Sequence, residues 1–224
     1  MATSLVGVLR GGPSAEYEVS LRTGQAVLDN LPSAYEGRDI LIDKNGVWHW
    51  QGLPAYPQEL LPRLDVVFNA LHGEYGEDGR VQSLLDTLGT PYTGSRTFAS
   101  AVAMKKAMAK EVLARAGLKT PFGLVVSAEN DEAAAARLVF AKVGPPWVVK
   151  PADRGSSVGV SLVRHFADLP AAIDRARQVS PQVLAEEYIA GKEITCGVLD
   201  EFRGANQVHG PVRAAPVGAS LGAN

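Results

Sequence analysis

A lysine followed by a glycine- and serine-rich loop stands in the stretch VVKPADRGSSVGV, residues Val148–Val160. The apolar residues on both sides predict a β-hairpin whose turn runs from Asp153 to Ser157. Its glycines let the backbone approach a ligand closely, and the hydroxyl and amide groups of Ser156 and Ser157 can surround an anion. With the cation of Lys150 beside it, this loop is a candidate phosphate site. An ordinary polar turn beside an exposed lysine would have the same composition.

Two polar turns follow apolar segments in the first part of the chain. The sequence GGPSAE places a glycine pair after a predicted strand, with Ser14 as the predicted cap of a helix that carries Glu16 in its first turn. The helix dipole alone would favour an acidic residue there. The second turn, LHGEYGEDG, contains His72, whose imidazole titrates near neutral pH and could exchange a proton with a ligand. A solvated polar loop is the alternative interpretation of this turn.

Cations and carboxylates recur farther along the chain. Lys105, Lys106 and Lys110 share one predicted helix, where such a series more often forms a solvated face than an anion site. The segment EEYIAGKE runs from Glu186 to Glu193 and contains a short extended stretch. Extended backbone can bind the edge of a purine ring, and a carboxylate can bind ribose hydroxyl groups.

Alternating strands and helices must position these groups. In the first part of the chain, apolar periodicity and glycine turns predict strands at residues 4–9, 37–43, 47–50 and 64–71 and helices at residues 15–31 and 79–88. This alternation predicts a small open α/β domain whose ligand crevice lies beyond the carboxyl ends of the strands. Both polar turns fall on that edge.

The second part of the chain has a different, α+β pattern. The sequence predicts one strong helix at residues 98–116, further helices at 130–142 and 167–178, and strands at 122–127, 147–150, 158–163, 183–188 and 193–199. We expect domains at residues 1–96 and 97–202. Residues 203–224 are rich in glycine, alanine and proline without a helix or strand period, which predicts a disordered or non-native tail.

Bulk composition narrows the class of protein. The chain has 224 residues, of which 46% are hydrophobic and 21% charged, and its net charge is −2, as in ordinary globular proteins. The absence of a basic block argues against a nucleic-acid partner. No apolar run approaches the ~18 residues of a membrane span, so we expect no membrane partner and a cytoplasmic location. Neither a P-loop, a dinucleotide fingerprint nor a metal-ligand motif is present, and we expect Cys196 to be a buried thiol in a strand.

The order of the motifs is more specific than any one of them. The chain contains, in sequence, Gly-Gly-x-Ser-Ala-Glu, Leu-His-Gly-x-x-Gly-Glu-Asp-Gly, Met-x-Lys, Val-Lys-Pro-x-x-x-Gly-Ser-Ser-Val-Gly-Val and Glu-x-x-x-x-Gly-x-Glu. This arrangement, over about residues 6–199, resembles the D-alanine:D-alanine ligases of the ATP-grasp superfamily. The resemblance implies an N-terminal open parallel α/β domain (pre-ATP-grasp) followed by the α+β central ATP-grasp subdomain.

The resemblance also implies roles for individual residues. Lys106 and Lys150 would bind the phosphates of ATP, and Ser156 and Ser157 would belong to the loop over them. Glu193 would bind the ribose. Four residues would hold the adenine: Glu186, Glu187, Tyr188 and Ile189. The last three adenine contacts would be made largely by the backbone. Glu16 would bind the ammonium group of the first D-alanine and join Ser156 in a catalytic hydrogen-bond network, with His72 near that D-alanine.

In the family, ATP phosphorylates the first D-alanine, and the amine of the second D-alanine attacks the D-alanyl phosphate to form the dipeptide. This reaction serves peptidoglycan precursor synthesis. The family pattern places the Mg²⁺ ligands in a C-terminal part that we expect to be missing, so no metal ligands are assigned and we expect weak or no turnover. Alternatives are a non-catalytic nucleotide-binding module, or a relative that joins D-alanine to D-lactate or D-serine. A homodimer through the N-terminal domain is a further implication. Lys105 and Arg154 depart from the family, which commonly has Asp and Glu there.

Overall fold

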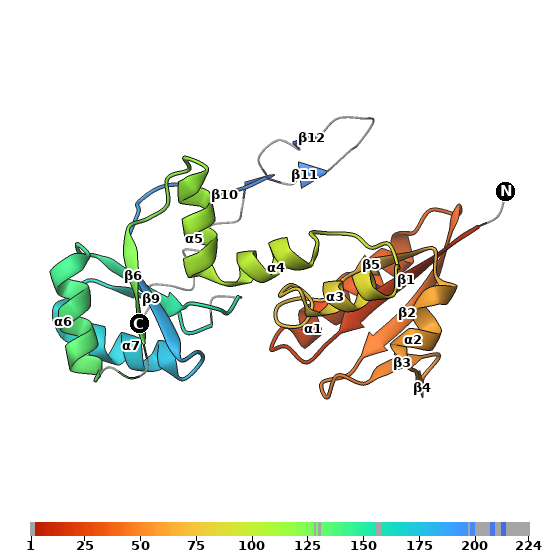
Figure 1. Ribbon diagram of the computed structural model, residues 1–224, viewed down its shortest axis with the longest axis horizontal. Coiled ribbons are helices and arrows are strands. Elements are labelled where there is room, and N and C mark those ends of the chain that lie inside the picture. Colours follow the sequence, from red (N-terminus) through yellow and green to blue (C-terminus); the bar gives the residue numbers. More distant parts are fainter. Residues whose placement is uncertain are drawn as a thin grey trace.

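The computed structural model describes residues 3–127, 129, 131–155, 158–196, 198–199, 207–208 and 212–213. Two sheets far apart in the sequence organise this part of the chain, and helices between them connect the N-terminal sheet to the second sheet (Figure 1). The predicted change from an α/β to an α+β pattern is therefore visible as two separate sheets with different topologies.

The N-terminal sheet has five strands in the order β4-β3-β2-β1-β5. Their bounds are β1 Ser4–Gly11, β2 Tyr35–Ile42, β3 Trp48–Trp50, β4 Leu53–Pro54 and β5 Val66–Asn69. The central strand β1 pairs in parallel with β2 and β5, whereas β2, β3 and β4 form an antiparallel meander at one edge. The predicted parallel sheet is confirmed at its centre, and the turn at Asn45 and Gly46 adds an antiparallel edge.

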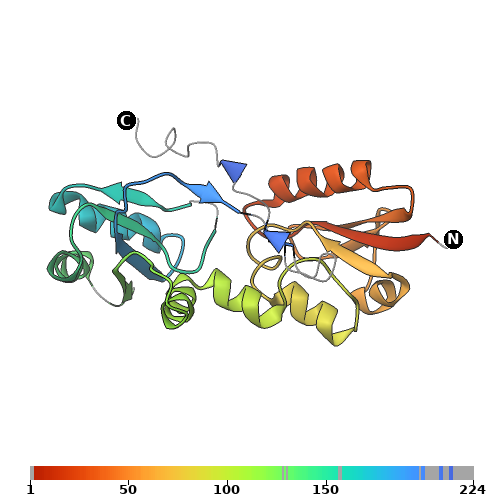
Figure 2. The same cartoon turned by 90° about the horizontal axis from the view of Figure 1, so that it is seen from above.

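Helices cover both faces of this sheet (Figure 2). On one face α1, Tyr17–Asn30, packs over Val6 and Val8 of β1. On the other face α3, Arg80–Thr87, packs over Leu9 and other buried apolar side chains, together with α2, Pro57–Leu60, and the 3-10 turn Leu61–Arg63. Successive residues of β1 thus alternate between two apolar cores, as expected for a buried parallel strand.

The predicted long helix at residues 98–116 is wrong, because the structure has two helices there. α4 spans Thr97–Met104 and α5 spans Lys106–Arg115, and the two run in different directions (Figure 1). Between them Lys105 leaves helical geometry, with φ −91° and ψ 93°. The backbone N–H of Lys106 donates to the carbonyl of Ala152 at 2.9 Å, so a tertiary hydrogen bond replaces a helical one at the break.

The second sheet has four antiparallel strands in the order β6-β9-β7-β8. Its elements are β6 Gly123–Ser127, α6 Glu132–Lys142, β7 Trp147–Pro151, β8 Ser161–Val163, the 3-10 turn Phe166–Asp168, α7 Leu169–Arg177 and β9 Gln182–Glu187. α6 and α7 cover one face, where Trp147 and Ile173 belong to a buried apolar cluster. Residues on the opposite face, such as Lys150, alternate with these core residues along β7.

The predicted hairpin between β7 and β8 is confirmed, but its connection is longer than the predicted turn. Pairing with β8 ends at Val149 and Ser161. Beyond that point β7 continues only beside β9, and the N–H of Ala152 donates to the carbonyl of Gln182 at 2.9 Å. A nine-residue range, 152–160, therefore lies between the two strands, and positions 156 and 157 in it are outside the described residues.

The predicted strand at residues 193–199 is replaced by two short strands. β10, Ile194–Thr195, pairs with β13, Val212–Arg213, and β11, Val198–Leu199, pairs with β12, Gln207–Val208. Cys196 lies between β10 and β11 and is exposed, which corrects the expected buried thiol. The predicted tail, residues 203–224, lies outside the described residues except for β12 and β13. In the described part of the chain, no helix combines the length and apolar character needed to span a bilayer.

Candidate functional site

The glycine turn after β1 and the histidine loop after β5 meet at the carboxyl edge of the N-terminal sheet. The hydroxyl of Ser14 accepts from the backbone N–H of Glu16 at 3.1 Å and donates to the carbonyl of His72 at 2.6 Å. Ser14 is therefore not the predicted helix cap, because its hydroxyl bridges two loops, and the N-cap residue of α1 is Glu16. This bridge brings two of the predicted substrate-binding residues to one edge.

Neighbouring side chains hold His72 in place. Its Nε2 lies 2.9 Å from the Oγ1 of Thr23 on α1, and its Nδ1 lies 3.9 Å from a carboxylate oxygen of Glu77. The other carboxylate oxygen of Glu77 accepts from the N–H of Gly73 at 3.0 Å. The imidazole thus has a hydroxyl on one side and an anion of its own loop on the other.

The carboxylate of Glu16 lies in a space that only small residues leave open. A Cβ added to Gly73 would approach the Oε2 of Glu16 to 2.6 Å, and Gly73 has a φ of +69°, which favours glycine. From the second region, Gly155 comes so close that its added Cβ would lie 3.6 Å from the same oxygen. The glycine-rich connection after β7 therefore reaches the carboxylate of Glu16, as the sequence motifs predict for these two segments.

A cavity of about 160 Å³ lies where the two regions meet at Glu16. The lining residues come from the turn after β1, the loop after β5, the end of α4, the connection after β7, and Val179: Pro13, Ser14, Ala15, Glu16, Gly73, Glu74, Met104, Asp153, Arg154, Gly155, Val158 and Val179. Sites for drug-sized ligands occupy about 300–1,000 Å³, so this cavity suits only a small molecule.

Four charged side chains cluster between α5 and the open face of the second sheet. The carboxylate of Glu186 on β9 is buried and forms ion pairs with Lys110 through one oxygen and with Lys150 through the other. Lys110 also donates to the carbonyl of Pro121. The ammonium group of Lys106 interacts electrostatically with Lys150 and Glu186, which places these groups on one side of the molecule.

Lys106 carries the clearest electrostatic signature of this cluster. Burial lowers the pKa of Lys106 below its ordinary value, and the positive charge of Lys150 lowers this pKa further. Asp153 and Glu186 oppose this shift but do not cancel it. Three ammonium groups face two carboxylates, those of Glu186 and Asp153, so the cluster has an excess of positive charge that would stabilise a bound anion.

Arg154 connects the cluster to the Glu16 cavity. Its carbonyl accepts from the ammonium group of Lys106, and its guanidinium pairs with the carboxylate of Glu74 in the loop after β5. The candidate anion site and the candidate small-molecule site are thus bridged by one residue of the connection after β7.

The segment predicted to hold adenine follows Glu186 at the end of β9. The N–H of Glu187 donates to the carbonyl of Phe122 at 2.8 Å, and the N–H of Tyr188 donates to the carbonyl of Pro146 at 2.8 Å. Because these two amides bind the protein itself, an adenine ring would have to be held by other groups of the segment. Ile189 and Glu193 are exposed.

The described residues do not cover every part of the predicted site. Ser156 and Ser157 lie outside the described residues. Within the described ranges, no group of three or more His, Cys, Asp or Glu side chains is arranged to hold a metal ion.

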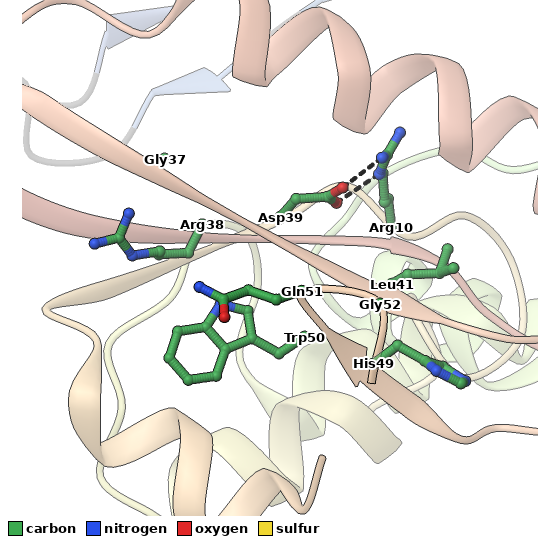
Figure 3. A pocket seen from close by; sticks show the side chains of 9 residues that line it. All are labelled: Arg10, Gly37, Arg38, Asp39, Leu41, His49, Trp50, Gln51 and Gly52. Atoms are coloured by element: carbon green, nitrogen blue, oxygen red, sulfur yellow. Dashed lines mark hydrogen bonds and ion pairs between the residues drawn. The ribbon is translucent and has the colours of Figure 1, made fainter. Parts of the chain in front are cut away.

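A larger cavity, of about 390 Å³, lies away from this site, over strands β1, β2 and β3 (Figure 3). Its charged residues neutralise one another, because Arg10 forms two hydrogen bonds with Asp39 at 2.5 and 2.6 Å. Arg38 likewise pairs with Glu36. Among the described residues, an excess of positive charge gathers at the lysine cluster and not in this larger cavity. Arg154 connects that cluster to the smaller cavity, so the candidate site is placed there.

Sequence reasoning missed two contributors to the site. Lys110 looked like part of a solvated helix face, and its partner Glu186 lies 76 positions away. Arg154 looked like a departure from a pattern, and its partner Glu74 lies 80 positions away. No local signal identifies either pair, although the excess of cations near the loop is visible in the sequence.

Comparisons with known proteins match both parts of the chain to one family. A family model described as D-ala D-ala ligase N-terminus matches residues 49–95, and one described as D-ala D-ala ligase C-terminus matches residues 112–219. Among solved structures, the D-alanine-D-alanine ligase from Helicobacter pylori has a TM-score of 0.83 at 26% identity, covering 95% of this chain and 71% of that chain. The VanG D-Ala:D-Ser ligase from Enterococcus faecalis has a TM-score of 0.78 at 29% identity, covering 92% and 68%.

Curated relatives are more similar in sequence. A D-alanine--D-alanine ligase of Geobacter sulfurreducens is 43% identical over 204 residues, which cover 90% of this chain and 60% of the relative. One of Trichlorobacter lovleyi is 41% identical over 213 residues, which cover 94% of this chain and 62% of the relative. The chain thus spans about three fifths of the length of these relatives. From its motifs, its fold and these matches together, the chain belongs to the D-alanine–D-alanine ligase family.

Proposed function

We propose that the described residues form the nucleotide-binding and first-substrate part of an ATP-dependent ligase that joins two D-alanines. The observation that carries this proposal is the lysine cluster around Glu186, which Arg154 connects to the Glu16 cavity. A site that transfers a phosphoryl group to a small amino acid needs both parts within reach of each other.

The charge of the cluster fits a triphosphate. Phosphoryl transfer depends mainly on positioning and on cations at the phosphate oxygens. In this proposal Lys106 and Lys150 hold the phosphates, and the resemblance adds Ser156 and Ser157 of the loop. The adenine and ribose would lie along residues 186–193. The family uses Mg²⁺ with ATP, but the described residues offer no metal cluster, so no step is assigned to a metal.

The Glu16 cavity fits the first amino acid. The carboxylate of Glu16 would bind the ammonium group of D-alanine, because the attraction between opposite charges is stronger in a partly enclosed space than in bulk water. Ser14 fixes the backbone at Glu16, and His72 lies at the same edge. The phosphoryl group of ATP would pass to the carboxylate of this D-alanine. The amine of the second D-alanine would then attack the acyl phosphate, forming the peptide bond and releasing phosphate.

Calorimetric titration with ATP tests the nucleotide part of the proposal. We expect Lys150→Ala to weaken ATP binding by about 10- to 100-fold, because a charge-assisted hydrogen bond contributes about 1.5–3 kcal/mol. Lys142→Ala is the matched control, since this exposed lysine ends α6, a helix on the opposite face of the sheet. Equal ATP affinity in the two variants would contradict the phosphate assignment.

Release of ADP in the presence of D-alanine tests the catalytic part. ADP release that requires D-alanine supports a ligase, and ATP binding without such release supports a non-catalytic nucleotide-binding module. The similarity to a D-Ala:D-Ser ligase makes D-serine the natural competitor as second substrate. Product analysis with D-alanine and D-serine supplied together would discriminate the two.

A further inference from the structure

Arg154 contacts both α5 and the loop after β5. Its backbone carbonyl accepts from Lys106, at the first residue of α5, and its guanidinium pairs with Glu74, in the loop after β5. Glu74 is itself held by Arg80 at 2.7 Å. Arg80 in turn pairs with Asp78 at 2.7 Å, which anchors the carboxylate of Glu74 to the start of α3. The segment after β7 is therefore tied to the N-terminal region by a chain of charged contacts.

These contacts fix one wall of the Glu16 cavity. Asp153, Arg154 and Gly155 line that cavity together with Glu16 and Glu74. The ion pair between Glu74 and Arg154 joins two of these lining residues, one from each region.

We propose that the Glu74–Arg154 ion pair is a positioning contact that holds the segment 152–155 against the N-terminal region before nucleotide binds, and that it thereby increases nucleotide affinity. The affinity part of this inference rests on the proposed function. Lys106 has three N–H donors, so it can hold the carbonyl of Arg154 and phosphate oxygens at the same time. A segment that is already held loses less conformational freedom when the ligand arrives, and binding is tighter for that reason.

The sign of one substitution separates this role from simple electrostatics. Glu74→Gln removes a negative charge near a site for an anion, so an electrostatic effect alone would tighten ATP binding. The positioning role predicts the opposite, because the uncharged amide forms no ion pair with Arg154 and holds it less firmly. The side chains of Arg154 and Glu74 are 40% and 43% exposed, so we expect a modest loss of affinity, about two- to fivefold.

A double-mutant cycle measured by calorimetric titration with ATP tests the proposal. The four proteins are the wild type, Glu74→Gln, Arg154→Gln and the double variant, each checked for an unchanged thermal unfolding midpoint. We expect Glu74→Gln to weaken binding in the wild-type background and to have no further effect when Arg154 is already glutamine. Unchanged or tighter binding by Glu74→Gln, or an equal loss in both backgrounds, overturns the inference.

Proteolysis provides a readout that needs no nucleotide. Trypsin cleaves after Arg154, and we expect this cleavage to be about two- to fivefold faster in Glu74→Gln than in the wild type, because the ion pair no longer holds the segment. A wild-type protein that binds no ATP would refute the proposed function and the affinity effect, while faster cleavage in Glu74→Gln would still support the positioning contact. A wild-type protein that binds ATP, with equal cleavage rates and equal affinities, would refute the inference and leave the proposed function standing.

Discussion

The two halves of the candidate site are built in different ways. On the N-terminal side, Glu16 and His72 are positioned by hydrogen bonds with the neutral hydroxyl groups of Ser14 and Thr23, at the edge of a sheet with both faces covered. On the other side, lysine ammonium groups converge on Glu186 at a sheet face opposite the helices α6 and α7. The first half fixes the shape of a small cavity, and the second half brings several positive charges close together.

Because they are built differently, the two halves should respond differently to substitution. A change on the N-terminal side should act through backbone geometry, because its polar groups are held by loops and glycines. A change in the lysine cluster should act through charge balance, because two carboxylates, those of Glu186 and Asp153, face three ammonium groups. The following experiments test this contrast, in order of decreasing expected effect.

Removing the shared charge should have the largest effect. Glu186→Gln leaves Lys110 and Lys150 next to an uncharged amide in a largely buried position. Breaking a buried ion pair typically costs 3–5 kcal/mol, and because both lysines are about a fifth exposed we expect a loss of about 3 kcal/mol in the free energy of unfolding. Urea unfolding measures it. The exposed Glu193→Gln is the control, and similar losses in both variants would show that Glu186 does not balance the cluster.

Adding one methyl group on the N-terminal side should have an intermediate effect. Gly73→Ala forces a side chain into a conformation with φ +69° and towards Glu16, so we expect unfolding to become easier by about 1–2 kcal/mol. Gly155→Ala approaches the same carboxylate at an ordinary 3.6 Å and should change stability by less than about 0.5 kcal/mol. If urea unfolding finds the two variants equally destabilised, backbone geometry is not what fixes this half.

Protonation of Lys106 should give the smallest effect. Its folded-state pKa is lowered from 10.5, so between that lowered value and 10.5 the unfolded chain binds more protons, and stability rises with pH across this window. A bound phosphate should raise the pKa again, so ATP binding at a pH within this window should take up a fraction of one proton. Calorimetry in two buffers of different ionisation enthalpy measures the uptake, and Lys106→Met should abolish it. Identical binding enthalpies in both buffers for the wild type would argue against a lowered pKa.

Sequence patterns predicted which strands and helices exist better than they predicted where these elements end and what they contact. The turn at Asn45 and Gly46, the strand β1 and the hairpin of β7 and β8 followed from local periodicity and turn residues, which act within a few positions. The break before Lys106 was missed because Ala, Met and Lys favour a continuous helix, and the N–H of Lys106 donates instead to the carbonyl of Ala152, which is distant in sequence.

The motifs of the candidate site were predicted from the sequence, but the side-chain contacts between them were not. The approach of Gly155 to Glu16 agrees with what the family resemblance implies for these two segments, whereas the pairing of Lys110 with Glu186 depends on how α5 lies against the second sheet. Side-chain partners far apart in the sequence are decided by tertiary packing, which local propensity does not encode. The roles assigned to individual residues on ATP and D-alanine remain predictions for the experiments above.

The single carboxylate at Glu186 also constrains how this protein can evolve. Because both of its oxygens are engaged by ammonium groups, a mutation to a neutral residue at 186 leaves two like charges without their partner, and loss of either lysine leaves one carboxylate oxygen without its ion-pair partner. Positions 110, 150 and 186 therefore cannot drift independently. Replacing any one of these three residues should first give a less stable protein, unless a compensating substitution elsewhere accompanies the change.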